Sequence, residues 1–156
     1  MRSFSSTADI AASADRVWQV MIDVERWHEW TASIASVTLL DGSPLAVGRR
    51  AKIRQPKLPA AVWRVTAIEP GRSFTWISVA PGIRVVAKHQ IEPTAFGCRA
   101  SLSLDIEGPF GGLLGRLTGD ITRYYLGLEA AGLKQRSERP EVQRHGDVST
   151  AQQQRA

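Results

Sequence analysis

Residues 109–135, PFGGLLGRLTGDITRYYLGLEAAGLKQ, are the last long apolar stretch of the chain and predict a helix that the preceding residues cover. Pro109 suits a helix start, because its missing N–H would be unpaired in the first turn in any case. Apolar side chains recur at helical spacing, and this predicts a buried stripe made of Leu113, Leu117, Ile121, Tyr124, Leu128 and Ala131. Tyr125 is expected to turn away from that stripe.

Three glycines lie four residues apart in the first half of this helix, at positions 111, 115 and 119. Each glycine costs about 1 kcal/mol of helix stability relative to alanine, so their presence needs a reason. Two explanations remain open from the spacing. The helix backbone could pack closely on a sheet, or a thin helix could leave a cavity beneath it.

The residues before this helix predict seven strands and two short helices. A strand is expected over residues 3–10, and Ser13 then suits the N-cap of a helix that Val17 and Trp18 continue. A second short helix is expected over residues 24–30. Turn-rich segments recur about every ten residues thereafter, which is typical of an antiparallel meander with strands over residues 34–40, 48–54, 61–69, 72–79, 83–92 and 98–107.

Alternation within these strands predicts which side chains face the helix. In the last strand Leu102 and Leu104 alternate with polar residues, so Asp105 and Glu107 are expected to point outward and no inward acid is evident. The same pattern predicts a further inward set, comprising Trp63, Val65, Ala67, Phe74, Trp76, Ile83, Val85, Ala87, His89 and Ile91.

The length and composition indicate the class of protein. The 156 residues fit one domain, and 43% hydrophobic with 22% charged residues is typical of a globular chain. The single cysteine, Cys98, cannot form an intramolecular disulfide and is expected in the core. No apolar run reaches the roughly 18 residues of a membrane span, and no signal peptide is evident, so we expect a cytoplasmic protein. Residues 1–135 are the predicted domain, and residues 136–156 are a predicted disordered, polar tail.

The formal net charge of +5 raises the question of an anionic partner. The only dense basic run lies at residues 49–57, where alternation places Arg50, Lys52 and Arg54 on one side of a strand. A solvated outer face explains this run, so we expect no nucleic-acid partner. A protein-interaction module that uses this face is the alternative.

The predicted order of one strand, two helices, six strands and a long helix is that of the helix-grip fold. Specific segments add to this: VWQVMIDVERWHEW with Asp23, Trp27 and Trp30, then VTAIEPGRSFTWIS and KHQIEPTAFGCRASLSLDIEG. Residues 3–135 resemble the SRPBCC superfamily, also called START-like or Bet v-like. Within it they are similar to the bacterial polyketide cyclase/dehydrase and lipid-transport group.

This resemblance implies an α+β architecture, in which a curved seven-stranded antiparallel sheet grips the C-terminal helix around a largely apolar cavity. Members of the superfamily bind lipids, polyketides and other hydrophobic small molecules, and some catalyse cyclisation or dehydration. No metal or nucleotide cofactor is usual, and none is expected here.

His89 is the strongest candidate for chemistry, because alternation places its imidazole among inward apolar residues. A core histidine satisfied by a neighbour is the competing interpretation. Tyr124 is predicted to offer its hydroxyl to the same space, which would make an acid/base pair with His89. His28 is expected to be exposed, and His145 belongs to the tail. The predicted ligand contacts are Trp30, Trp63, Phe74, Trp76, His89, Leu102, Leu104, Leu117, Ile121, Tyr124 and Leu128.

Three functions follow as hypotheses. The first is binding or transport of a hydrophobic or aromatic small molecule. The second is a cyclase/dehydrase-type enzyme that uses His89 as acid/base and Tyr124 as hydrogen-bond donor. The third is the interaction module, which uses its basic strand face and its tail. Monomeric and dimeric states are both compatible with the sequence.

Overall fold

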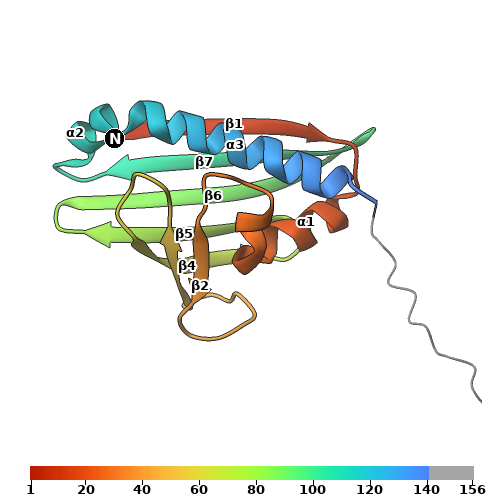
Figure 1. The fold of residues 1–156 in the computed structure, drawn as a ribbon, viewed down its shortest axis with the longest axis horizontal. Coiled ribbons are helices and arrows are strands. Elements are labelled where there is room, and N and C mark those ends of the chain that lie inside the picture. The colour runs from red at the N-terminus through yellow and green to blue at the C-terminus, as the bar shows by residue number, and fades with distance from the viewer. Residues whose placement is uncertain (141–156) are drawn as a thin grey trace, which may run out of the picture.

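The computed structural model describes residues 1–140 and contains one seven-stranded antiparallel sheet (Figure 1). Its strand order is β1-β7-β6-β5-β4-β3-β2. The elements in chain order are β1 (Arg2–Ile10), α1 (Ala14–Ile22), the 3-10 helix η1 (Val24–Glu29), β2 (Ser36–Leu39), β3 (Arg50–Arg54), β4 (Ala61–Glu69), β5 (Ser73–Ala80), β6 (Ile83–Thr94), β7 (Gly97–Glu107), α2 (Gly111–Leu117) and α3 (Gly119–Glu138).

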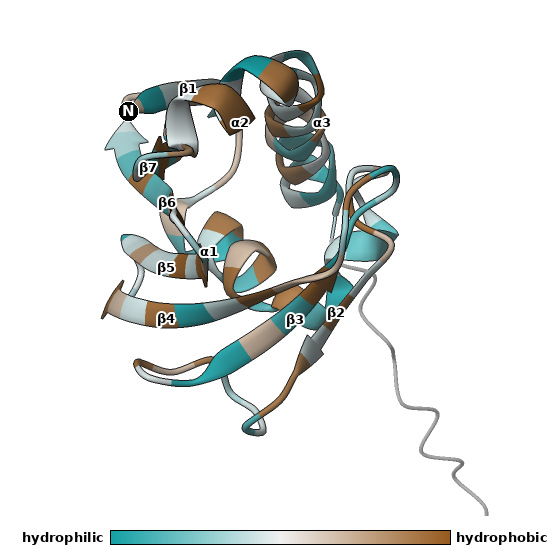
Figure 2. Ribbon diagram, turned by 90° about the vertical axis from the view of Figure 1, so that its left-hand side faces the viewer, coloured by the Kyte–Doolittle hydropathy of each residue, from teal (hydrophilic) through white to brown (hydrophobic). Residues whose placement is uncertain are grey.

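The helix-grip prediction is confirmed. After β1 the helices α1 and η1 connect to β2, which forms the opposite edge of the sheet. The strands β3 to β7 then follow in order across the sheet, and β7 pairs with β1. Figure 2 shows that the sheet curls, with α3 over its concave side. In Figure 1, α2 lies at one end of α3 and α1 lies near its other end.

The α1–η1 pair is fixed by capping and by aromatic packing. The Arg16 backbone N–H donates to Ser13 Oγ at 3.2 Å, which confirms the predicted N-cap. The Trp27 indole Nε1 donates to the Met21 carbonyl oxygen at 2.9 Å, so η1 is tied to α1. Trp27 also packs at 5.4 Å, centroid to centroid, on Trp76 of β5. The helices α1 and η1 therefore close one end of the sheet.

The C-terminal helix is broken at Thr118, so the predicted single helix is wrong at this point. The Thr118 backbone N–H and hydroxyl both donate to the Leu114 carbonyl oxygen at 2.9 Å. A hydroxyl that competes for a helix carbonyl commonly bends or ends the helix there. At the other end α3 continues to Glu138, whose Oε1 accepts from the Ala11 backbone N–H at 2.9 Å.

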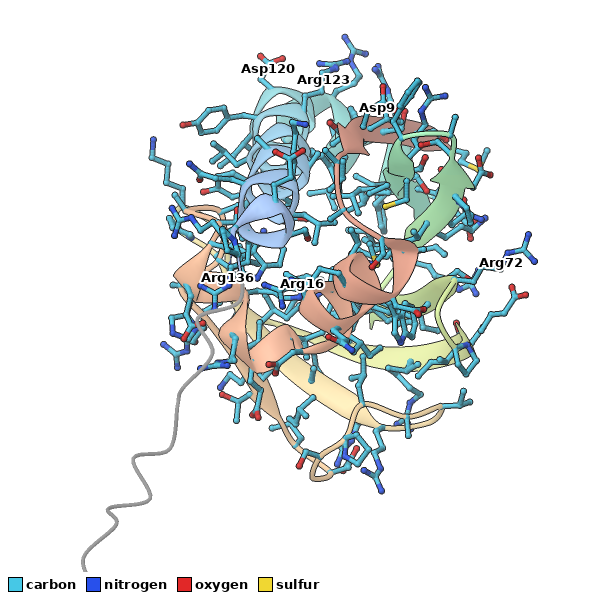
Figure 3. All side chains as sticks on the ribbon, turned by 90° about the vertical axis from the view of Figure 1, so that its right-hand side faces the viewer. Asp9, Arg16, Arg72, Asp120, Arg123 and Arg136 are labelled. Carbon is cyan, nitrogen blue, oxygen red and sulfur yellow. The ribbon has the colours of Figure 1, made fainter. Side chains whose placement is uncertain are left out.

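The predicted buried stripe is also wrong. Leu113, Leu117 and Tyr124 are 61%, 75% and 64% exposed, and Ala131 is exposed. The stripe is exposed on both sides of the break, and α3 buries a different face, made of Tyr125, Leu126, Glu129, Ala130 and Leu133. Figure 3 shows Asp120 and Arg123 projecting from the outer side of α3, where they form an ion pair at 3.2 Å.

Close packing accounts for two of the three glycines. A Cβ on Gly115 would lie 2.8 Å from Arg2 Cβ, and one on Gly111 would lie 3.1 Å from the Ile106 carbonyl oxygen. These two glycines therefore let α2 approach β1 and β7. A Cβ on Gly119 would make only ordinary contacts, 3.5 Å or more from its neighbours, and the structure also contains a cavity beneath the helices.

Strand faces follow the predicted alternation with one correction. Val65, Phe74, Ala87 and Ile91 are buried, but Ala67 is exposed. The β4–β5 pairing shifts register between Val65 and Ala67, and this bulge moves the later residues of β4 to the opposite face. Cys98 is fully buried as predicted, and burial raises the pKa of its thiol.

The basic face is confirmed as an outer face, with Arg50 and Arg54 exposed. Arg50 is not a free cation, because its Nη2 pairs with Asp41 Oδ1 at 2.8 Å and lowers the pKa of Asp41 to about 2.

His28 is exposed as expected. Of the predicted tail, residues 136–138 are helical, and residues 141–156, with His145, lie outside the described residues. Within residues 1–140, none of the helices has both the length and the hydropathy of a membrane span.

Candidate functional site

A cavity of about 580 Å³ lies between the concave face of the sheet and the α2–α3 segment. Apolar side chains form most of its wall, and within residues 1–140 no lysine or arginine lines it. The sheet contributes Trp63, Trp76, Ile83, Val85, Ala87, His89, Leu102, Leu104 and Ile106. The helices contribute Leu114, Thr118, Thr122, Tyr125, Leu126 and Glu129.

The two ends of the cavity differ. Trp27 of η1 lines one end, which the α1–η1 pair closes. The β3–β4 loop and the β5–β6 turn line the other end, where Val62 is 45% exposed and Val79 is 68% exposed. The Tyr125 hydroxyl donates to the Pro56 carbonyl oxygen and so ties α3 to the β3–β4 loop.

His89 lines the cavity from β6 and is 5% exposed. Its ring stacks on Phe74 with centroids 4.2 Å apart and planes 8° from parallel, and Trp27 lies 5.3 Å away. Within the described residues, Nδ1 has no hydrogen-bond partner. Burial lowers the pKa of His89 to about 3, so the imidazole is neutral at pH 7.

Glu129 lines the same cavity from α3 and is 8% exposed. Its Oε1 accepts from the Ser33 hydroxyl at 3.0 Å, and Ser33 Oγ lies 2.9 Å from Thr31 Oγ1. Burial raises the pKa of Glu129 to about 7, against the opposing effect of the Ser33 hydrogen bond. The expectation that no acid faces inward is therefore wrong.

Sequence reasoning missed Glu129 because it followed the apolar stripe through Leu117, which faces solvent. Leu126, Glu129 and Leu133 share another face of α3 at spacings of three and four, and Glu129 is the polar member of that face. Ser33 gave no signal, since it lies outside any periodic segment.

The structure brings together part of the predicted site. Trp63, Trp76, His89, Leu102 and Leu104 line the cavity. The remaining predicted contacts are not among the lining residues, for reasons that differ.

Phe74 is buried behind the His89 ring, and Trp30 packs on Trp27 with centroids 5.8 Å apart. Leu117 and Tyr124 are exposed, and Ile121 and Leu128 are half-buried. The predicted pairing of His89 with Tyr124 is therefore wrong.

The neighbouring tyrosine has the inward position instead, because Tyr125 is 7% exposed and lines the cavity. The titratable groups that face the cavity from β6 and α3 are thus His89, Tyr125 and Glu129, and Thr122 of α3 adds a hydroxyl. Since Tyr125 is engaged with the β3–β4 loop, His89 and Glu129 are the two titratable groups left to meet a ligand.

Comparison with protein families agrees with this architecture. The model for "Polyketide cyclase / dehydrase and lipid transport" matches residues 1–138. The chain belongs to this family. The match includes every strand and helix of the described residues, and it includes both His89 and Glu129.

Solved structures share the family fold at low identity. The Zhui aromatase/cyclase from a Streptomyces species has a TM-score of 0.73 at 16% identity, covering 88% of this chain and 94% of that chain. A START superfamily protein from Mycobacterium smegmatis has a TM-score of 0.66 at 19% identity, covering 87% of this chain and 97% of that one. A protein from Thermus thermophilus has a TM-score of 0.70 at 18% identity, covering 87% and 97%. No curated protein matches the chain.

Proposed function

We propose that the protein binds, or carries, a hydrophobic or aromatic small molecule in the cavity between its sheet and α3. The observation that supports this most is the cavity itself, since about 580 Å³ of mostly apolar space is of the size that small-molecule sites have. Family membership supports it as well. The indole rings of Trp63 and Trp76 supply flat contact surface, and His89 and Glu129 supply polar contacts.

A cavity-filling substitution tests the proposal. Ala87 lines the cavity from β6, so Ala87→Phe would occupy space that a ligand needs. Ala67→Phe is the matched control, because it makes the same change at an exposed position on β4. The binding probe is N-phenyl-1-naphthylamine, an uncharged dye whose fluorescence rises in apolar surroundings.

We expect the unmodified protein to bind the dye, Ala87→Phe to weaken binding at least tenfold, and Ala67→Phe to leave it unchanged. Thermal unfolding must first show that both variants are folded. Dye binding that is absent from the unmodified protein, or equal in the two variants, would overturn the proposal. Native mass spectrometry of the purified protein, with extraction of any bound molecule, then identifies the natural ligand class.

A second candidate function is cyclase/dehydrase-type catalysis, and one observation favours it: two titratable groups line one apolar cavity. In loss of water from a β-hydroxy ketone, a base takes the proton beside the carbonyl and an acid protonates the leaving hydroxyl. A histidine whose pKa is about 3 is a weak base, whereas a carboxyl whose pKa is about 7 is well matched to proton transfer. The carboxyl of Glu129 is thus the better-suited group.

The two functions are separated by Glu129→Gln, which keeps the shape of the side chain and removes its proton-transfer capacity. Catalysis predicts that enone formation from a β-hydroxy aryl ketone, followed by ultraviolet absorbance, falls at least 100-fold while dye binding persists. Absence of turnover in the unmodified protein, with dye binding intact, would leave binding as the function.

A further inference from the structure

The ionisable side chains that line the cavity restrict the charge of the ligands that it can bind. Among the lining residues in 1–140, the ionisable side chains are His89, Tyr125 and Glu129, and none is a lysine or arginine. A buried carboxylate ligand would therefore lack a compensating cation. The penalty for such an uncompensated buried ion is several kcal/mol, so the cavity disfavours anionic ligands by its composition.

Glu129 is held in one arrangement by its neighbours. Ser33 is fully buried and donates to Oε1 at 3.0 Å, while Thr31 lies 2.9 Å from the same hydroxyl and is 4% exposed. Glu129 has no other hydrogen bond within the described residues. Because Ser33 occupies Oε1 as an acceptor, the second oxygen, Oε2, is the one left to meet a ligand.

The surroundings of this carboxyl carry no formal charge. His89 on β6 is kept neutral by burial, and Tyr125 on α3 donates its hydroxyl to Pro56. The loop that follows η1 presents the hydroxyls of Ser33 and Thr31. No charged partner contributes to the pKa of Glu129, which is set by burial and by Ser33.

We propose that Glu129, protonated on Oε2, donates a hydrogen bond to an uncharged carbonyl acceptor on the ligand, and that the cavity excludes carboxylate ligands of the same shape. The ligand class is thus an uncharged aromatic ketone or aldehyde rather than a fatty or aromatic acid. This inference rests on the proposed binding function and names the polar group that its ligand carries. Glu129 acts in it as a specificity-determining residue.

A ligand amine is the main competing partner, and it differs in the sign of its pH dependence. An ammonium group would pair with ionised Glu129, so its affinity would rise as the pH passes through 7. A carbonyl needs the protonated carboxyl, so its affinity falls over the same range. Because the pKa of Glu129 is raised to about 7, both changes in affinity should occur within the pH range in which binding can be measured.

The experiment uses naphthalene probes of nearly equal shape: 2-acetylnaphthalene, 2-ethylnaphthalene, 2-naphthoate and 2-(aminomethyl)naphthalene. Quenching of the tryptophan fluorescence reports binding, because Trp27, Trp63 and Trp76 line the cavity. The quantity compared is the ratio of ketone affinity to ethylnaphthalene affinity, since the hydrocarbon removes the common apolar and pH effects. The proteins are the unmodified chain, Glu129→Gln and the outward control Glu107→Gln.

We expect 2-naphthoate to bind at least about 100-fold more weakly than the ketone, as a buried unpaired ion requires. Between pH 5.5 and 8.5 the ketone ratio should fall about three- to tenfold in the unmodified protein, which is the net effect of one hydrogen bond. The ratio should be constant in Glu129→Gln, whose amide donates at every pH, and should fall normally in Glu107→Gln.

Four outcomes overturn the inference. They are naphthoate binding equal to ketone binding, a pH-independent ratio in the unmodified protein, the same pH-dependent fall in Glu129→Gln, and an amine that binds most tightly with affinity rising with pH. In each of these the hydrocarbon still binds, so the proposed binding function survives. If none of the probes binds, the binding function fails and this inference fails with it.

Discussion

The free energy of unfolding of the protein should depend on pH through the titration of Glu129. Burial raises the pKa of this carboxyl to about 7 in the folded chain, against an ordinary value of 4.5. Between these values the folded protein retains a proton that the unfolded chain has released, so the free energy of unfolding falls as the pH rises. One pKa unit corresponds to about 1.4 kcal/mol, and the difference therefore removes about 3 kcal/mol by pH 8.

Glu129→Gln isolates this contribution, because glutamine keeps the Ser33 hydrogen bond and does not titrate. Urea unfolding, followed by tryptophan fluorescence at half-unit steps from pH 4 to pH 8.5, gives the free energy of unfolding of both proteins. We expect the unmodified protein to lose about 3 kcal/mol relative to Glu129→Gln between pH 4.5 and pH 8. The control Glu107→Gln should show no such change relative to the unmodified protein.

Parallel pH curves for the unmodified protein and Glu129→Gln would refute this reasoning. They would mean that the carboxyl is hydrated through the cavity in solution and titrates as an exposed group does. The ligand inference would then lose its protonated donor at neutral pH. A change of the opposite sign would imply a cation close to Glu129.

Three further predictions follow from the packing. His89→Gln should gain about 2 kcal/mol of stability relative to the unmodified protein as the pH falls from 6.5 to 4.5, because the folded-state pKa of His89, about 3, makes protonation favour the unfolded chain. Gly132→Ala should lower the thermal midpoint, since its Cβ would overlap a backbone oxygen at the end of η1, whereas Gly127→Ala has open space and should gain up to about 1 kcal/mol. Tyr125→Phe should cost about 1 kcal/mol in urea unfolding by releasing the β3–β4 loop, and Tyr124→Phe, at an exposed position, should cost nothing measurable.

The sheet was predictable from sequence because its signals are local. Alternation and turn residues repeat in each strand, so an error in one strand does not spread to the next. Ala67 shows the limit, since a bulge reverses the faces within a strand and leaves no mark in the composition.

The helix face was not predictable in the same way, because apolar residues lie on more than one side of this segment. The predicted stripe through Leu117 and Tyr124 faces solvent, whereas the face with Tyr125 is buried. His89 was found because it lies on a strand, where alternation assigns the face, and Glu129 was missed because it does not lie on the predicted stripe. The contact between Glu129 and Ser33 joins residues 96 positions apart, which no local pattern records.

The two buried groups, Glu129 and His89, change the free energy of unfolding with opposite signs as the pH rises. As the pH rises from 4.5 to 6.5, Glu129 lowers the free energy of unfolding while His89 raises it, each by about 1.4 kcal/mol per pH unit. The unmodified protein should therefore show little net change from this pair in that range. Glu129→Gln should become more stable with rising pH, and His89→Gln should become less stable.

The double variant should again vary little over the same range, because both contributions are removed. The exposed carboxyls contribute equally to all four proteins, so they cancel in the differences. Agreement of the double variant with the sum of the single variants would show that the two sites titrate independently. A departure of more than about 0.5 kcal/mol would mean that His89 and Glu129 interact across the cavity.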